Sequence, residues 1–233
     1  MISVCLASYN GAAFIAQQIE SILIQLDATD ELIISDDGST DNTLEIVTSY
    51  QKAYSQIRIY EGPRQGVVKN FEFAISHSRG DLIFLADQDD VWLPDKVAKM
   101  SNAFAENPEA DVVISDLKIV DGQLKPVHSS YFEYRQVKEG FWHNLLRSGY
   151  IGAGMAFRKE LKEKILPFPK KIPMHDMWIG LVAGKGVFLL QEPLTLYRRH
   201  EKNASEIQST TSFYQKFIWR FEIIIPLIQN AFK

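Results

Sequence analysis

Three carboxylates stand within four positions of one segment, DLIFLADQDDVWLPDK at residues 81–96. Asp87, Asp89 and Asp90 follow an apolar run directly, and like charges this close repel one another, so a positive partner is expected there. Mg²⁺ and Mn²⁺ prefer oxygen ligands, and they are held by one or two protein carboxylates together with substrate phosphates and water. On this interpretation Asp89 ligates a metal, and Asp87 reaches a ribose or a metal-bound water. D-x-D triplets also occur in ordinary solvated loops. The predicted elements around this triplet are therefore needed to decide whether it binds a metal.

Short β-rich runs alternate with helical patterns through the first hundred residues. The predicted strands are ISVCLA, ELIISD, IRIYEG and DLIFLA, and the predicted helices cover 12–26, 41–54, 66–78 and 94–106. Four such units predict a mainly parallel sheet that helices cover on both faces. Ligands of such sheets bind beyond the carboxyl ends of the strands, where this chain has SYNG, DDGST, GPRQG and DQDD. This placement favours a metal-binding role for Asp89.

The pattern changes after Pro108. The run ADVVISDLKIVDGQL predicts two strands or a hairpin that turns at Asp121 and Gly122, which makes the sheet mixed. Residues 123–140 are polar and aromatic without a clear period, which is typical of a mobile loop over a site. The run GYIGAGMAF at 149–157 has three glycines where backbone can approach a ligand, with a bulged strand as the alternative.

Composition narrows the class of partner. The net charge of −4 argues against nucleic acid, whose binding needs a basic face. The single cysteine, Cys5, suits a reducing compartment and a buried structural thiol. The opening MISVCLASYN is expected to form a strand rather than a secretory leader. The apolar tail at 213–233 is interrupted by charges and Pro226, so it predicts a helix on a membrane surface, or one that packs on the domain or on a second copy in a homodimer.

Six motifs in order carry a resemblance to a known family. They are SVCLASYNG, LIISDDGSTDNT, ADQDDVWLPDK, GAGMAF, MHDMWIGLVA and YRRHEKNAS. Over 1–205 the chain resembles inverting family-two glycosyltransferases with the A-type nucleotide-diphospho-sugar transferase fold. The variants ADQDD and HD followed by Trp178 look most like bacterial rhamnosyltransferases and hexosyltransferases of surface polysaccharide synthesis. The resemblance implies a nucleotide-sugar half at 1–107, an acceptor half at 108–205 and a separate tail at 206–233.

The resemblance also implies roles for residues of the nucleotide-sugar half. Ala7 and Tyr9 would line the nucleotide, with the Tyr9 ring against the base, and Asp37 would accept from the N3 imide of uracil or thymine. Asp36 would orient that loop. Asp87 would contact the ribose and Asp89 the metal, Mn²⁺ or Mg²⁺. The residues expected near the diphosphate, sugar or acceptor are Lys69, Asp90, Trp92 and Gly152.

The acceptor half is expected to supply the catalytic base. The family's acidic pair points to Asp176, preceded here by His175, for which we expect an orienting role or that of a second base candidate. The alternative is that Asp176 only caps the helix that follows. His200 would complete the metal shell, and Arg198 or Arg199 would neutralise the leaving diphosphate.

The activity that the resemblance implies is transfer of a sugar from a UDP- or dTDP-sugar to a saccharide hydroxyl with inversion. The implied acceptor is linked to undecaprenyl diphosphate, at the cytoplasmic face of the membrane, in O-antigen or capsule synthesis. Two alternatives stay open at this point. A nucleotidyltransferase or diphosphate hydrolase can share the fold, although SYNG lacks the basic residue such a phosphate loop needs. A non-catalytic sugar-binding module is the other.

Overall fold

A computed structural model describes residues 1–200 and 222–230 of the chain. The first half contains β1 (Ile2–Ser8), α1 (Ile15–Leu23), β2 (Glu31–Asp36), α2 (Thr43–Ala53), β3 (Ile57–Glu61), α3 (Val67–His77), β4 (Leu82–Asp87), β5 (Val91–Trp92) and α4 (Lys96–Glu106). The second half contains β6 (Val112–Asp121), β7 (Pro126–His128), α5 (Tyr131–Arg135), α6 (Phe141–Leu146), β8 (Met155–Arg158), α7 (Lys159–Ile165), α8 (His175–Ala183) and β9 (Val187–Arg199). Single 3₁₀ turns lie at Gly152–Gly154 and Gly184–Gly186. A further helix covers 222–230.

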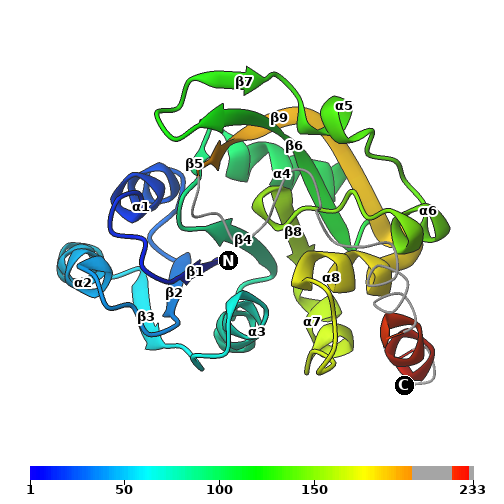
Figure 1. Cartoon of the computed structure of the whole chain (residues 1–233), viewed down its shortest axis with the longest axis horizontal. Coiled ribbons are helices and arrows are strands. Elements are labelled where there is room, and N and C mark those ends of the chain that lie inside the picture. The colour runs from blue at the N-terminus through cyan, green and yellow to red at the C-terminus, as the bar shows by residue number, and fades with distance from the viewer. Residues whose placement is uncertain (201–221, 231–233) are drawn as a thin grey trace.

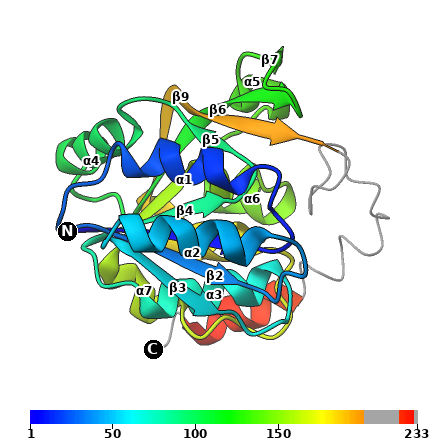
Figure 2. The same ribbon diagram turned by 90° about the vertical axis from the view of Figure 1, so that its left-hand side faces the viewer.

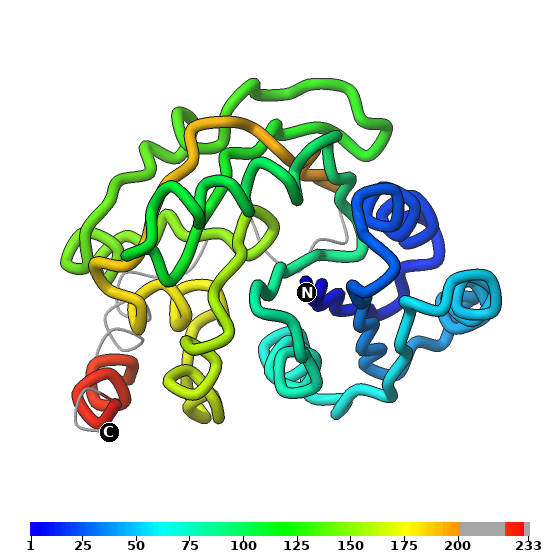
Figure 3. Tube along the Cα trace, turned by 180° about the vertical axis from the view of Figure 1, so that it is seen from behind, coloured from blue at the N-terminus to red at the C-terminus, as the bar shows by residue number. Residues whose placement is uncertain are grey.

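One mixed sheet runs through the molecule in the order β3-β2-β1-β4-β8-β6-β9-β5, with β7 paired to β6 (Figure 1). The strands β3, β2, β1 and β4 are mutually parallel, as the alternation of runs predicted. β8 joins the two halves because it pairs antiparallel with both β4 and β6. The blue-to-cyan first half and the green-to-orange second half therefore lie side by side, as Figure 3 shows from behind.

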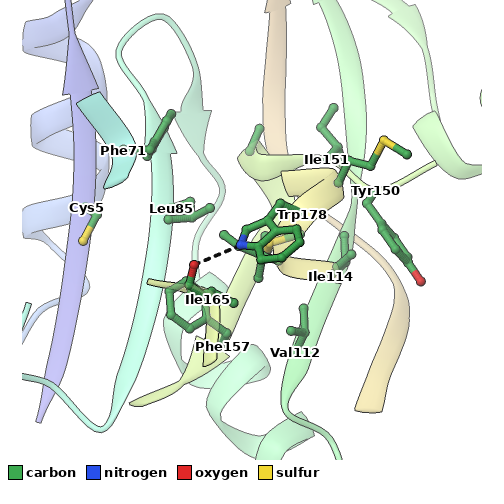
Figure 4. Packing of buried hydrophobic residues seen from close by; sticks show 14 of the residues in the cluster. Cys5, Phe71, Leu85, Val112, Ile114, Tyr150, Ile151, Phe157, Ile165 and Trp178 are labelled. Atoms are coloured by element: carbon green, nitrogen blue, oxygen red, sulfur yellow. Dashed lines mark hydrogen bonds between the residues drawn. The ribbon is translucent and has the colours of Figure 1, made fainter. Parts of the chain in front are cut away.

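The strands of the first half are buried on both faces, and alternate side chains enter two separate cores. Val4 and Leu6 of β1 pack with residues of α1, α2 and α4, whereas Cys5 packs with residues of α3, α7 and α8. Figure 2 shows α1 and α2 running along the sheet. In the core that contains Cys5, the Trp178 indole donates to the Ile165 carbonyl oxygen at 3.0 Å (Figure 4). This hydrogen bond connects α8 to α7. Burial on both faces accounts for the continuous apolar runs of these strands.

In the second half the predicted hairpin that turns at Asp121 and Gly122 is confirmed, but its strands and the segment after it differ in extent from the predicted elements. The run after Pro108 is a single strand, β6, and the hairpin turn at Asp121 leads to the short strand β7. Residues 123–140 are not one long loop, since they contain both β7 and α5. The side chain of Ser130 accepts from the Glu133 amide at the start of α5, and Tyr131 and Phe132 are buried. A cap and two buried rings therefore order a segment that has no clear hydrophobic period.

The predicted tail lies partly outside the described residues, as does the predicted boundary at 205 and 206. Within the helix at 222–230, Ile223 is buried in the core cluster, and Glu222 pairs with Lys171 at 3.0 Å. Ile225 and Ile228 are exposed. Over 1–200 and 222–230, no helix has the length and apolar character needed to cross a bilayer.

Candidate active site

A cavity of about 820 Å³ opens at the carboxyl ends of β1, β2 and β4. Its first wall comes from the loops that follow these strands and β3, and includes Ala7, Ser8, Tyr9, Asp37, Gly38, Arg64, Asn70, Asp87, Gln88 and Asp89. Its second wall comes from the second half of the chain and includes Tyr131, Arg135, Ser148, Tyr150, Gly152, His175, Asp176 and Tyr197. The cavity therefore has the size of a small-molecule binding site, and each half of the chain supplies one of its walls.

Asp36 and Asp37 are adjacent but do different things. Asp36 is buried and accepts hydrogen bonds from the Ser8 hydroxyl and from the Gly38 and Ser39 amides. This network fixes the loop after β2, as expected for Asp36. Asp37 lines the cavity, where its carboxylate accepts from the Gly66 amide at 2.7 Å. One oxygen of Asp37 is thus positioned by the backbone of the neighbouring loop.

Gln88 joins the first and fourth loops of this wall. Its side-chain oxygen accepts from the Tyr9 amide, and its side-chain nitrogen donates to the Tyr9 carbonyl oxygen, both at 2.9 Å. The Tyr9 ring itself stays 56% exposed at the cavity. A flat, exposed ring fixed by its backbone offers a stacking surface. The sequence analysis missed Gln88, and its place between Asp87 and Asp89 was the only signal.

The acidic loop, residues 87–90, concentrates negative charge beside the cavity. Burial, followed by the Asp89 and Asp176 charges, raises the pKa of Asp87 to about 7. Burial and the Asp89 charge also raise the pKa of Asp90, whose carboxylate accepts from the Arg198 amide at 2.9 Å. Lys96 opposes both shifts. The loop therefore favours added positive charge, as the sequence pattern indicated.

His200 lies directly at the acidic loop. Its Nε2 is 2.9 Å from the Asp89 Oδ2, and its ring stacks on Phe14 with the ring centres 4.6 Å apart. Among residues 1–200 and 222–230, no three His, Cys, Asp or Glu side chains form a ready metal cluster. A divalent ion that shares its coordination with substrate phosphates needs only one or two protein carboxylates. The donor set of Asp89, with Asp87 and His200 beside it, fits such a shared ion.

Asp176 faces the cavity from the second wall, in the first turn of α8. One carboxylate oxygen accepts from the Met177 amide at 2.6 Å, and the other accepts from the Gly152 amide at 3.1 Å. Burial raises the pKa of Asp176 to about 6, although both hydrogen bonds oppose the shift. The N-cap of α8 is Met174 and no side chain caps the helix, so Asp176 is not its cap. The Asp176 carboxylate faces the cavity with a pKa suited to proton transfer near neutrality.

Sequence comparison shows the family to which this chain belongs. The model described as glycosyl transferase family 2 matches residues 3–166. The chain belongs to this family. Within the family, an uncharacterized glycosyltransferase of Nostoc sp. is 30% identical over 215 residues, which cover 87% of this chain and 66% of that protein. The dTDP-rhamnosyl transferase RfbG of Shigella flexneri is 28% identical over 232 residues, covering 91% and 76%.

Solved structures of glycosyltransferases share the fold of this family 2 member. TarS 1–349 of S. aureus in complex with UDP-GlcNAc is 20% identical, covers 96% of this chain and 66% of its own, and has a TM-score of 0.71. The mannosyltransferase PcManGT of Pyrobaculum calidifontis, in complex with GDP-Man and Mn²⁺, is 18% identical with a TM-score of 0.62, covering 99% and 64%. The chain therefore has the A-type glycosyltransferase fold, and it spans about two thirds of the length of several of these proteins.

The structure of this family 2 glycosyltransferase brings most of the expected site residues to one cavity. The residues that line it are Ala7, Tyr9, Asp37, Asp87, Asp89, Gly152, His175 and Asp176. His175 is buried and stacks on Phe71 with ring centres 4.1 Å apart, and burial lowers the pKa of His175 to about 3. A neutral imidazole in this position suits an orienting role better than that of a base.

Six expected residues are not among those that line the cavity, and Trp92 is the clearest correction; they are Lys69, Asp90, Trp92, Arg198, Arg199 and His200. Trp92 is buried because β5 pairs with β9, which turns its indole into the core beside Phe84 and Lys96. Asp90 is likewise buried, against the Arg198 amide.

Lys69 and Arg199 are engaged elsewhere. Lys69 pairs with Glu72 one helical turn along α3, whereas its neighbour Asn70 lines the cavity. Arg199 donates to the Tyr197 hydroxyl at 3.0 Å. Arg198 also lies off the cavity lining, and it donates to the Asp89 carbonyl oxygen and to the Gln17 side chain. Arg198 therefore stabilises the backbone of the acidic loop.

Proposed function

We propose that this family 2 glycosyltransferase moves a sugar from a UDP- or dTDP-sugar to a hydroxyl of a saccharide acceptor, with inversion at the anomeric carbon. One observation carries the proposal: Asp176 on the second wall shares a cavity with Asp37, Asp87 and Asp89 on the first. An inverting displacement needs a base on the acceptor side and a binding site for the leaving diphosphate opposite it. In this proposal the second wall supplies the base and the first wall supplies the site for the diphosphate.

The first wall is the proposed donor site. Asp37 accepts the N3 imide proton of uracil or thymine, which cytosine lacks, while the Gly66 amide holds its carboxylate. Ala7 and the exposed Tyr9 ring pack against the base, and Asp87 binds the ribose. RfbG is named a dTDP-rhamnosyl transferase, and TarS 1–349 was solved with UDP-GlcNAc, so both donor types occur among similar proteins. A uracil or thymine nucleotide is therefore the proposed donor class.

Asp89 and His200 are the residues that would hold a divalent ion, Mn²⁺ or Mg²⁺. When bound, such an ion supplies positive charge next to the diphosphate, where negative charge grows as the sugar leaves. PcManGT was solved with Mn²⁺ and GDP-Man. The surplus of carboxylates in the acidic loop and the raised pKa of Asp87 support the proposal that this chain also binds a divalent ion.

Asp176 is the proposed general base. The acceptor oxygen attacks the anomeric carbon as its proton passes to the Asp176 carboxylate, and the bond between that carbon and the diphosphate oxygen breaks on the opposite face. With its pKa near 6, the carboxylate is mostly ionised at neutral pH yet basic enough to take the proton. The Gly152 amide orients one carboxylate oxygen. His175 orients the start of α8 through its stack on Phe71.

The acceptor and its setting complete the proposal. The tyrosines Tyr131, Tyr150 and Tyr197 on the second wall offer rings against which sugar faces can pack. We propose an acceptor linked to undecaprenyl diphosphate, in bacterial O-antigen or capsule synthesis at the cytoplasmic face of the membrane. The segment 213–233 would then provide peripheral membrane contact or a homodimer contact.

The testing experiment is a thermal-shift and hydrolysis panel of UDP- and dTDP-sugars, each with Mn²⁺, with Mg²⁺ and with chelator. Wild type is compared with Asp89→Ala and with Asp95→Asn, a control on the exposed residue before α4. Asp95 has a left-handed backbone that asparagine also adopts readily. Metal-dependent stabilisation by one nucleotide sugar, kept in Asp95→Asn and lost in Asp89→Ala, supports the proposal. Wild-type hydrolysis that is unaffected by chelator contradicts the metal-dependent mechanism.

A further inference from the structure

Lys96 is a fully buried lysine that none of the proposed steps uses. Burial lowers the pKa of its amine to about 7, although the charges of Asp90 and Asp87 oppose the shift. Its Nζ donates to the Ala153 carbonyl oxygen and to the Thr195 hydroxyl, both at 2.7 Å, and lies 4.5 Å from the centre of the Trp92 ring. A buried ammonium group is costly to desolvate, and an apolar side chain of the same length would fill this space at a lower cost. The lysine therefore calls for an explanation beyond packing.

The contacts of Lys96 join three segments that are far apart in the sequence. Lys96 begins α4, a few residues after the acidic loop, while Ala153 lies in the 3₁₀ turn Gly152–Gly154 and Thr195 lies in β9. The Thr195 hydroxyl is also 3.3 Å from the Ala153 carbonyl oxygen, to which it donates. This carbonyl is thus held from two sides, at the point where the two halves of the chain meet.

The same turn contacts the proposed base. Gly152, next to Ala153, donates its amide to the Asp176 carboxylate at 3.1 Å. One short path therefore runs from Lys96 through the Ala153 carbonyl and the Gly152 amide to Asp176. At its other end, Lys96 lies close enough to Asp87 and Asp90 to act on their charge.

We propose that Lys96 is a positioning residue, which fixes the Gly152–Gly154 turn against the acidic loop so that Asp176 faces the donor held by Asp87 and Asp89. The inference rests on the proposed function for its catalytic consequence, but the structural link can be measured separately. A misplacement of a reacting group by about 1 Å can cost on the order of 10²-fold in rate. Methionine at position 96 would keep the packing volume but lose the hydrogen bond to the Ala153 carbonyl oxygen.

The kinetic test compares Lys96→Met with Lys162→Met. Lys162 is a matched control because its Nζ also donates to two oxygens, the carbonyls of Ser76 and Ser78 at 2.9 and 2.8 Å, and it does not line the cavity. We measure hydrolysis of the nucleotide sugar found in the panel, with water in place of the acceptor. We expect Lys96→Met to lower kcat by roughly tenfold or more at saturating donor and Lys162→Met to leave it unchanged. Equal kcat values for the two variants overturn the proposal.

A second measurement does not depend on any activity. Amide hydrogen exchange at Gly152, followed by NMR, reports the bond to Asp176 directly. We expect it to be roughly tenfold faster in Lys96→Met, in line with the loss of a hydrogen bond of about 1.4 kcal/mol, and unchanged in Lys162→Met. Thr195→Val removes one partner of Lys96 at nearly the same volume and should accelerate exchange too, which covers the case where Lys96→Met fails to fold.

The two possible failures can be told apart. Unaltered Gly152 exchange in Lys96→Met, or in Thr195→Val if the first variant does not fold, overturns the positioning role whatever the enzyme does to nucleotide sugars. Absence of hydrolysis and of nucleotide-sugar binding in the wild type overturns the proposed function and leaves the exchange result as the decisive measurement for Lys96.

Discussion

The Gly152 amide donates to the Asp176 carboxylate at 3.1 Å, across 24 positions of sequence. Asp176 lies in the first turn of α8 and Gly152 lies in a turn beside the central strands, so this bond aligns the second wall of the cavity with the sheet. It also stabilises the ionised carboxylate and opposes the rise in pKa that burial causes. The geometry and the basicity of the proposed base thus depend on the same contact.

Asp176→Asn should abolish most of the turnover while leaving donor binding intact. Asparagine keeps the size of the side chain and can still accept from the Gly152 amide, but it cannot take a proton from the acceptor. Losing a general base typically costs about 10²- to 10⁴-fold in rate, and we expect that loss in kcat with little change in the donor Kd. Hydrolysis kinetics and calorimetric titration with the nucleotide sugar check both parts. Turnover within about threefold of wild type would remove Asp176 from the mechanism.

The pH dependence of kcat should show an acid limb near pH 6. Burial raises the pKa of Asp176 to about 6, and the base works only when deprotonated, so activity falls as the pH drops through that value. An unperturbed aspartate would place this limb near pH 4. At saturating donor, Asp87 is covered in the proposed donor site while Asp176 stays open to the acceptor, so kcat reports Asp176 and the titration of Asp87 in the free enzyme appears in kcat/KM.

His175→Gln provides the control for assigning the limb near pH 6 to Asp176. Because burial lowers the pKa of His175 to about 3, its imidazole is neutral over the whole range and contributes no limb near pH 6. The variant should therefore keep the limb at the same pH even if its rate is lower. A limb that disappears in His175→Gln would instead assign the titration to the histidine.

Gly152→Ala should disrupt the base by steric conflict alone. A Cβ at position 152 would lie 2.8 Å from the His175 Nε2, closer than real Cβ contacts allow. The backbone of Gly152 does not have a positive φ, so alanine is not disfavoured there by conformation. We expect a fall in kcat of roughly tenfold or more, in line with the cost of misplacing a catalytic group.

The double variant Gly152→Ala/His175→Ala tests the cause of that fall, because the smaller side chain at 175 makes room for the new methyl group. Its kcat should be at or above that of Gly152→Ala. Gly122→Ala is the matched control, since a Cβ there meets its nearest neighbour, the His200 Cβ, at an ordinary 3.7 Å. If the double variant is slower than both single variants, the conflict with His175 is not the cause.

The first wall could be predicted from the sequence because its chemistry follows from local order. Each buried strand of a parallel sheet ends at the same edge, so Asp37, Asp87 and Asp89 had to come together there. The alternation of strands and helices up to residue 106 is confirmed, as is the burial of Cys5. A continuous apolar run bounded by polar loops is a strong local signal, and no distant pairing is needed to interpret it.

The second wall and the surroundings of Trp92 and Lys96 could not be predicted in the same way, since distant contacts create them. Trp92 looks like a ligand-binding aromatic in sequence, but its pairing opposite Thr195 in β9 turns it into the core. In the sequence Lys96 is an ordinary residue of a helix start, and its proposed role depends on Ala153 and Thr195. Arg135 of α5 lines the cavity from a segment without hydrophobic period. Contacts between segments far apart in the sequence, which local patterns do not encode, decide the positions of Trp92, Lys96 and Arg135.

Metal dependence should weaken when His200 loses its imidazole. The His200 Nε2 lies 2.9 Å from Asp89 Oδ2, where it can ligate the ion or orient the carboxylate. Groups that support a metal site are typically worth about 10- to 100-fold in metal affinity, so His200→Ala should raise the Mn²⁺ concentration at half-maximal hydrolysis by at least about tenfold. Phe14→Leu is the control, because it removes the ring on which His200 stacks and keeps the nitrogen. Equal Mn²⁺ midpoints in wild type and His200→Ala would show that the metal site does not include His200, and an equal rise in Phe14→Leu would assign the effect to packing.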